Sequence, residues 1–153
     1  MTHEHLVNGA TYYIMTLVRG ADHRVLNVHG AGEVGETDIW TNTHSTTQQW
    51  TAHRMADGSW AFAYKRNPSA YLAADGQFKP LRVKNLDPNH HASARWKAED
   101  LGDGYLFCNV HEGNMALDLH ASGTCDGSGV HLSTRHGHQN QRWRLARVQG
   151  CEC

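Results

Sequence analysis

Short apolar runs with alternating polar positions recur along the whole chain, separated by turn-forming Gly, Asn or Asp residues. Such alternation over about four to eight residues predicts half-buried β-strands. No extended stretch shows the apolar stripe of an amphipathic helix. Residues 92–101 have helical propensity, but they align with non-helical copies elsewhere, so we expect at most one helical turn before Trp96. The pattern predicts an all-β protein.

The strand pattern repeats three times along the chain. Trp50, Trp96 and Trp143 are 46 and 47 residues apart, and each opens the last strand of one copy. Gln48 and Gln141 stand two positions before the first and third of these tryptophans. The regular spacing suggests that the tryptophans mark the fold, and we expect all three indoles to lie in the core.

We place the repeats at residues 9–57, 58–102 and 103–149. The expected strands are residues 11–15, 25–28, 38–40, 50–52, 59–63, 71–74, 82–84, 96–98, 104–108, 116–119, 131–133 and 143–145. One unit of four strands cannot bury its apolar face, whereas three units around a pseudo-threefold axis share a core and leave no open sheet edge. The prediction is a single β-trefoil domain over residues 1–153, with six barrel strands and six strands in capping hairpins.

The chain resembles the ricin B-type (R-type) lectins, β-trefoils with a Gln-x-Trp signature in each repeat. The resemblance covers almost the whole chain. It rests on Gln48-Gln49-Trp50, Gln141-Arg142-Trp143, the degenerate Ala94-Arg95-Trp96, and Leu117-Asp118-Leu119 in the expected second-strand register. It implies a non-catalytic lectin that binds galactose or N-acetylgalactosamine-type glycans.

The third repeat holds the fullest set of candidate sugar-binding residues. Inward-facing leucines flank Asp118, so its carboxylate is expected to point outward. The resemblance makes Asp118 the sugar-gripping aspartate, Asn140 a sugar contact and Gln141 the brace of the aspartate. His131 or Ser133 falls near the aromatic platform, and His131 is the better stacking partner. His120 is expected at the rim, and a turn-capping role for Asp118 remains the alternative.

The first repeat carries a partial copy of this set. Asn27 replaces the aspartate, Trp40 lies near the platform position, and Gln48 keeps the brace. Thr47 replaces the Asn, and Gly30 leaves room for a ligand to approach the backbone. We expect a weaker second site here.

The second repeat departs from the family pattern at each of these positions. Ala73, Ser93 and Ala94 replace the aspartate, the Asn and the Gln, and Asp75 could substitute only if its loop shifted. We expect this repeat to be structural.

The composition and motifs of the chain argue against several other classes of function. The 14 Lys and Arg residues balance 15 Asp and Glu residues, which argues against nucleic-acid binding through a basic patch. No apolar run is long enough for membrane insertion. The sequence has no Gly-x-Ser-x-Gly, no phosphate loop and no standard zinc spacing among its 13 histidines, so we expect neither an enzyme nor a metal or other cofactor. The histidines could make binding pH-sensitive between about pH 5 and 7.

The termini and cysteines bear on localisation. The N-terminus lacks a signal pattern, which favours a cytoplasmic or non-classically secreted protein. Reduced thiols are then expected for Cys108, Cys125, Cys151 and Cys153. The tail Cys151-Glu152-Cys153 is expected to be mobile more than a metal or redox site. The expected partners are glycans or glycoconjugates, with a homodimer possible.

Two other functions remain open from the sequence. A β-trefoil can inhibit proteases through its surface loops, for example through residues 85–91, because a fold does not determine a function. The chain could also be the carbohydrate-binding module of a larger enzyme or toxin. A glycan array together with a protease panel separates these cases.

Overall fold

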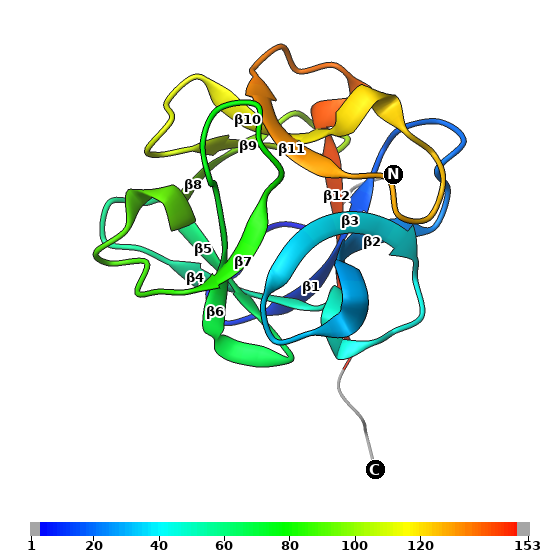
Figure 1. The fold of residues 1–153 in the computed structure, drawn as a ribbon. Coiled ribbons are helices and arrows are strands. Elements are labelled where there is room, and N and C mark those ends of the chain that lie inside the picture. Colours follow the sequence, from blue (N-terminus) through cyan, green and yellow to red (C-terminus); the bar gives the residue numbers. More distant parts are fainter. Residues whose placement is uncertain (1–3, 150–153) are drawn as a thin grey trace.

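The computed structural model describes residues 4–149, and the predicted Cys-Glu-Cys tail lies outside the described residues. The strands, in chain order, are β1 Thr11–Thr16, β2 Arg24–Val28, β3 Gly35–Thr41, β4 Trp50–Arg54, β5 Trp60–Tyr64, β6 Asn67–Ala73, β7 Arg82–Asn85, β8 Trp96–Asp100, β9 Tyr105–Asn109, β10 Met115–Leu119, β11 Val130–Thr134 and β12 Trp143–Arg147. The described chain is therefore all-β, as predicted, and its strands enclose a central core (Figure 1). No helix in the described part of the chain has the length and hydrophobicity needed to span a bilayer.

Six strands form a closed ring of antiparallel pairs. β1 pairs with β4, β4 with β5, β5 with β8, β8 with β9, β9 with β12, and β12 with β1. The remaining six strands form the hairpins β2–β3, β6–β7 and β10–β11. Closure gives every ring strand two neighbours and removes open sheet edges. This is the barrel-and-hairpin arrangement of a β-trefoil.

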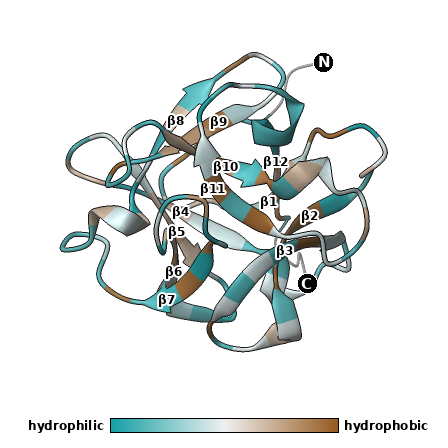
Figure 2. Cartoon of the chain, turned by 45° about the horizontal axis from the view of Figure 1, so that its top comes forward, coloured by the Kyte–Doolittle hydropathy of each residue, from teal (hydrophilic) through white to brown (hydrophobic). Residues whose placement is uncertain are grey.

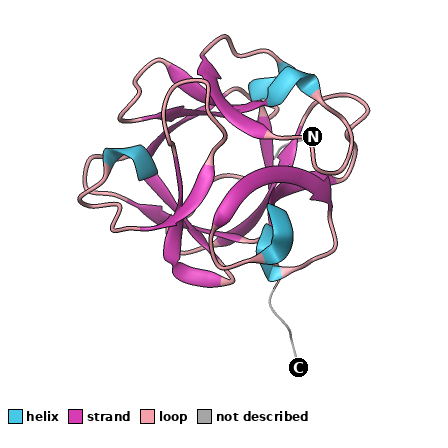
Figure 3. Cartoon of the chain, in the orientation of Figure 1, coloured by secondary structure: helices cyan, strands magenta, loops and turns pink. Residues whose placement is uncertain are grey.

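Short 3-10 turns join the strands on the outside of the molecule (Figure 3). The predicted turn before Trp96 is η3, Ala92–Ala94, and equivalent turns, η2 (Thr46–Gln48) and η5 (Gln139–Gln141), precede the other two tryptophans. Two further turns, η1 (His29–Ala31) and η4 (His120–Ser122), follow β2 and β10. These five turns carry or flank most of the candidate site residues.

The core is built around the three repeated indoles, each of which is 0% exposed. Each indole Nε1 donates a hydrogen bond to the backbone carbonyl of a second-strand leucine: Trp50 to Leu26 at 3.2 Å, Trp96 to Leu72 at 3.1 Å and Trp143 to Leu117 at 3.1 Å. A buried indole needs such a partner for its N–H. The predicted core position of the tryptophans is confirmed. Hydrophobic and hydrophilic residues alternate along the surrounding strands (Figure 2).

Candidate functional site

The third repeat brings Asp118, Asn140 and Gln141 together. Asp118 comes from β10, and the two amides come from η5, which delivers them to the aspartate just before the chain enters β12. Gln141 Nε2 donates to Asp118 Oδ2 at 2.9 Å, and Asn140 Nδ2 donates to Asp118 Oδ1 at 3.2 Å. His136 Nε2 lies 3.7 Å from Asp118 Oδ2. The carboxylate is therefore held at both oxygens by groups from the segment that follows β11.

Gln141 is fixed at both ends of its amide. Its Nε2 also donates to the carbonyl of Thr134 at 2.8 Å, and its Oε1 accepts from the backbone N–H groups of His136 and Gly137 at 2.9 and 3.1 Å. The side chain is fully buried. Gln141 thus ties the end of β11 to the turn before β12 and orients Asp118 as it does so.

Asp118 is more buried than the alternation of β10 suggests. Its neighbours Leu117 and Leu119 are buried as expected, but Asp118 itself is only 4% exposed because the two amides cover it. Burial raises the pKa of its carboxyl above the usual value, although the hydrogen bond from Gln141 and the nearby His136 act in the opposite direction. The expected outward direction leads into this polar network and not into open solvent.

His120 and His131 form the edge of the third-repeat site. Their rings are stacked, with centroids 4.1 Å apart and an interplanar angle of 19°. His131 lies directly opposite Asp118 in the β10–β11 register. Burial lowers the pKa of His131, and the neighbouring His120 lowers it further, so both favour the neutral ring. One face of His131 is therefore already occupied by the other imidazole.

The first repeat forms a pocket of about 450 Å³. Its lining includes the four residues predicted for the second site: Asn27, Gly30, Trp40 and Gln48. Trp40 is 38% exposed, and Gly30 has a φ of 77°, with open space on the side where a Cβ would lie. An exposed indole beside an open glycine leaves room for a flat ligand.

Asp38, which no motif in the sequence indicated, supplies a carboxylate that binds two residues of this pocket's lining, Asn27 and His29. It lies opposite Asn27 in the β2–β3 register and is 2% exposed. Its Oδ1 accepts from Asn27 Nδ2 at 2.8 Å, and its Oδ2 lies 2.9 Å from His29 Nδ1. Thr47 Oγ1 donates to Asn27 Oδ1 at 3.0 Å. The first repeat therefore also has a carboxylate–amide pair, but here the amide lies on the second strand and the carboxylate on the third. The only signal for Asp38 in the sequence was its position two residues before Trp40.

Gln48 has a different set of contacts from Gln141. Its Nε2 donates to the carbonyl of Thr41 at 3.1 Å, and its Oε1 accepts from the N–H of Thr43 at 2.9 Å. Both glutamines are buried and tie the third strand to the following turn. The architectural half of the Gln-x-Trp motif is thus present in both repeats, and Gln141 adds to it a hydrogen bond to a carboxylate.

The second repeat has alanines in place of the aspartate and the glutamine, and both, Ala73 and Ala94, are fully buried. Asp75 forms a hydrogen-bonded ion pair with Lys84, and the hydrogen bond from Lys84 lowers the pKa of the Asp75 carboxyl. The acid is therefore neutralised by a neighbour on β7. Within residues 4–149, no cluster of three or more His, Cys, Asp or Glu side chains could hold a metal ion.

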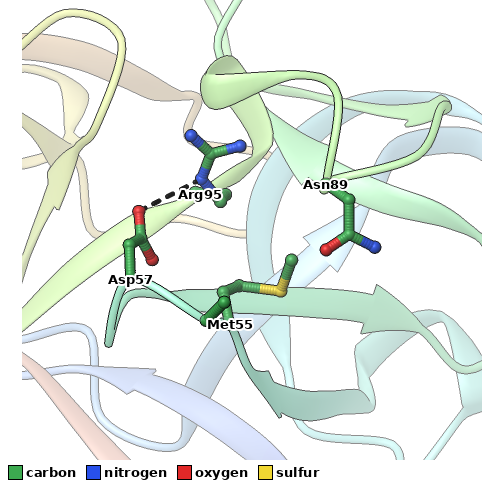
Figure 4. Close-up of a pocket in the computed structure, with 5 residues that line it drawn as sticks. Met55, Asp57, Asn89 and Arg95 are labelled. Carbon is green, nitrogen blue, oxygen red and sulfur yellow. Dashed lines mark ion pairs between the residues drawn. The ribbon is translucent and has the colours of Figure 1, made fainter.

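A smaller hollow of about 210 Å³ lies beside Met55, Asp57, Asn89 and Arg95 (Figure 4). Arg95 Nε lies 3.4 Å from Asp57 Oδ2, and Arg95 also donates to the carbonyl of Pro88 at 2.8 Å. The third repeat has a comparable ion pair, in which the Arg142 guanidinium lies 3.2 Å from the carboxylate of Asp103. In both cases the arginine precedes the core tryptophan. We interpret the hollow as part of the joint between repeats, because its charged groups already bind each other.

Similar solved structures share the fold of this chain. No family model and no curated protein sequence matches it. A designed three-fold symmetric protein, ThreeFoil, is 23% identical with a TM-score of 0.81, over 90% of this chain and 99% of that one. The Macrolepiota procera ricin B-like lectin, solved with lactose, is 20% identical with a TM-score of 0.78, over 95% and 100%. The C-half of an earthworm R-type lectin, solved with GalNAc, is 17% identical with a TM-score of 0.68, over 91% and 99%.

The chain also matches segments of longer proteins. It spans 18% of a mosquitocidal holotoxin, with 14% identity, a TM-score of 0.83 and coverage of 94% of this chain. At these identities the likenesses establish the β-trefoil fold.

Proposed function

We propose that this chain is a carbohydrate-binding lectin of the R-type family that binds galactose- or N-acetylgalactosamine-type glycans without catalysing a reaction. The observation that carries the proposal is the Asp118 carboxylate, held by the amides of Asn140 and Gln141. A sugar needs an oriented acceptor for two adjacent hydroxyls, and a carboxylate gives stronger hydrogen bonds than a neutral group. The matches to lectins solved with lactose and with GalNAc support this choice of ligand.

The pocket of the first repeat supports a second site. Trp40 offers an exposed ring face for the apolar side of a pyranose, and Asn27, whose amide binds Asp38, offers polar groups at one wall. We assign Gly30 to the open rim and Gln48 to the support of the third strand. Two sites on one chain, or one site on each half of a homodimer, would allow weak single-site binding to become strong on glycan-coated surfaces.

We further propose that residues 1–153 act as one domain with repeats at 9–57, 58–102 and 103–149. Glycans and glycoconjugates are the proposed partners, and neither nucleic acid nor membrane insertion is part of the proposal.

The match to part of a holotoxin favours one alternative within the same chemistry. There the chain would be a carbohydrate-binding module that works with a separate functional domain. The residues proposed to bind sugar are the same in both cases, and the full-length gene distinguishes them.

The direct test is a glycan array on the intact protein, followed by titration of the strongest ligand into wild type and Asp118→Ala. The proposal expects terminal galactose or N-acetylgalactosamine on the array. Loss of one charge-assisted hydrogen-bonding group costs about 1.5–3 kcal/mol, so affinity at the third-repeat site should fall by at least about tenfold. A blank array, combined with inhibition of a protease panel, would replace the lectin with a loop-based inhibitor.

A further inference from the structure

The third-repeat site has no aromatic ring at the strand position that carries Trp40 in the first repeat. Trp40 stands two residues beyond Asp38 on β3, and Ser133 stands two residues beyond His131 on β11. Asp38 and His131 each lie opposite the second-strand residue of their site, so Ser133 takes the place of Trp40. A hydroxyl offers no face for a sugar ring.

A loop from the second repeat passes beside this position. The loop of residues 74–81 joins β6 to β7 and reaches β11 of the third repeat (Figure 1, green loop beside the orange strand). There the carbonyl of Lys79 accepts a hydrogen bond from the N–H of Leu132 at 3.0 Å, and Pro80 forms a bridge with His131. The residue that precedes Lys79 is Phe78.

The first repeat receives the same type of loop from the third repeat. The carbonyl of Ser128 accepts from the N–H of Ile39 at 2.9 Å, and Gly129 forms a bridge with Asp38. Gly129 therefore corresponds to Pro80, and counting back two residues makes Gly127 the counterpart of Phe78. The correspondence places both loop residues beside the platform position of the neighbouring repeat.

Gly127 shows where a side chain at this loop position would begin. A Cβ added to Gly127 would lie 3.9 Å from Cζ3 of Trp40. At the first-repeat position the loop carries a small residue, Gly127, and the strand a large one, Trp40. At the third-repeat position the sizes are reversed: the loop carries Phe78 and the strand carries Ser133. The ring that the third-repeat strand lacks is available on the incoming loop.

Phe78 bears two costs that the fold does not explain. Its φ is 60°, in the left-handed region, where a bulky residue is strained. Its side chain is also 62% exposed, the largest value among the exposed large hydrophobic residues of the described chain. The counterpart Gly127 has a φ of 91°, which glycine adopts without strain. A contact with a ligand would use the exposed ring.

We propose that Phe78 supplies the aromatic platform of the third-repeat sugar site, so that this site is shared between two repeats. The inference rests on the proposed sugar-binding function. The apolar face of a galactose-type ring would pack on Phe78, while Asp118 accepts hydrogen bonds from its hydroxyls and Asn140 donates or accepts at the same edge. The third-repeat site is incomplete without the loop of residues 74–81.

The test titrates lactose into Phe78→Gly and Phe78→Trp, both in a Trp40→Ala background that removes the platform of the first-repeat pocket. Phe78→Gly should weaken lactose binding by about three- to tenfold, the usual range for one aromatic contact. It should also raise the melting temperature, because glycine relieves the left-handed strain. Phe78→Trp should keep lactose binding within about twofold of the background.

Val34 gives a matched control. Glu36 lies opposite Arg82 of the second repeat, just as Gly129 lies opposite Asp38 of the first. Counting back two residues from Glu36 gives Val34, which is therefore the third copy of the loop position. It faces the second repeat, which has no candidate site. It is also exposed, at 45%. Val34→Gly should leave lactose affinity unchanged.

The outcomes separate this inference from the proposed function. If Phe78→Gly binds lactose as tightly as the background while Asp118→Ala abolishes the binding, the platform assignment is wrong and the lectin proposal stands. If the wild-type protein binds no galactoside on the array, the lectin proposal and this inference both fail. A melting temperature that falls in Phe78→Gly while the lactose affinity stays unchanged would show that the ring has a structural role only.

Discussion

The amide nitrogen of Gln141 lies 2.9 Å from a carboxylate oxygen of Asp118, although the residues are 23 positions apart. The same side-chain amide donates to the carbonyl of Thr134 and accepts hydrogen bonds from the backbone N–H groups of His136 and Gly137. One buried side chain thus links the fold of the third repeat to the orientation of its candidate ligand-binding carboxylate.

Replacing Gln141 should therefore affect both stability and binding. Gln141→Ala leaves the backbone N–H groups of His136 and Gly137 without their acceptor, which should lower the free energy of unfolding by about 1–3 kcal/mol. Asp118 also loses its donor, so affinity at the third-repeat site should fall. Gln48→Ala is the matched control: urea unfolding should show a similar loss of stability, while titration in the Trp40→Ala background should show unchanged third-repeat affinity. Equal effects of the two variants on that affinity would contradict the assigned link.

Protonation of Asp118 should stabilise the fold and weaken sugar binding. Burial raises its folded-state pKa, so the folded protein takes up a proton at a higher pH than the unfolded chain does. As pH falls through this window, the contribution of Asp118 to the free energy of unfolding increases. Sugar binding should decrease over the same window because the protonated acid is a weaker acceptor.

Lactose titration and urea unfolding between about pH 4 and 8 measure both trends, starting from the ordinary aspartate value near 3.9. Asp118→Asn should bind more weakly and lose the acidic limb of the binding curve. A decrease in binding that persists in Asp118→Asn would assign the pH dependence to other groups, such as the histidines.

The core indoles should contribute to stability without contributing to binding. Trp96 lies in the repeat that has no candidate site, and its Nε1 donates to the carbonyl of Leu72. Trp96→Phe removes this bond and leaves a cavity, so the free energy of unfolding should fall by about 2–3 kcal/mol with unchanged sugar affinity. Trp40→Phe, at an exposed position, should change stability by less than about 0.5 kcal/mol. Denaturant unfolding of both variants compares them directly.

The first-repeat pocket should depend on Asp38. Asp38→Ala removes the partner of His29 and one of the acceptors for Asn27, which then keeps only its bonds to Val28 and Thr47. In an Asp118→Ala background, where the third-repeat site is silenced, the remaining lactose binding should fall by about tenfold or more. Thr41→Ala is a control on the same strand, because its side chain binds Asp126 outside the pocket. Retained binding in Asp38→Ala would show that Asn27 alone serves the pocket.

Much of the fold could be predicted because its signals are local. The alternation of apolar and polar residues predicts strands, and the even spacing of Trp50, Trp96 and Trp143 predicts a repeated unit whose indoles are buried. These features are determined by the sequence itself, because backbone alternation and repeat spacing require no knowledge of distant contacts. The pairing of Gln141 with Asp118 was instead implied by the resemblance to the R-type lectins.

The tertiary structure alone decided which side chains meet across strands and between repeats. Asp38 became part of the first-repeat site because the β2–β3 register sets it opposite Asn27, a relation that depends on how the hairpin pairs. Lys79 meets Leu132, and Pro80 meets His131, only because a loop of one repeat packs on a strand of the next. Asp118 is buried because two amides from the end of the chain fold over it. Such neighbours arise from long-range packing, which sequence position does not encode locally.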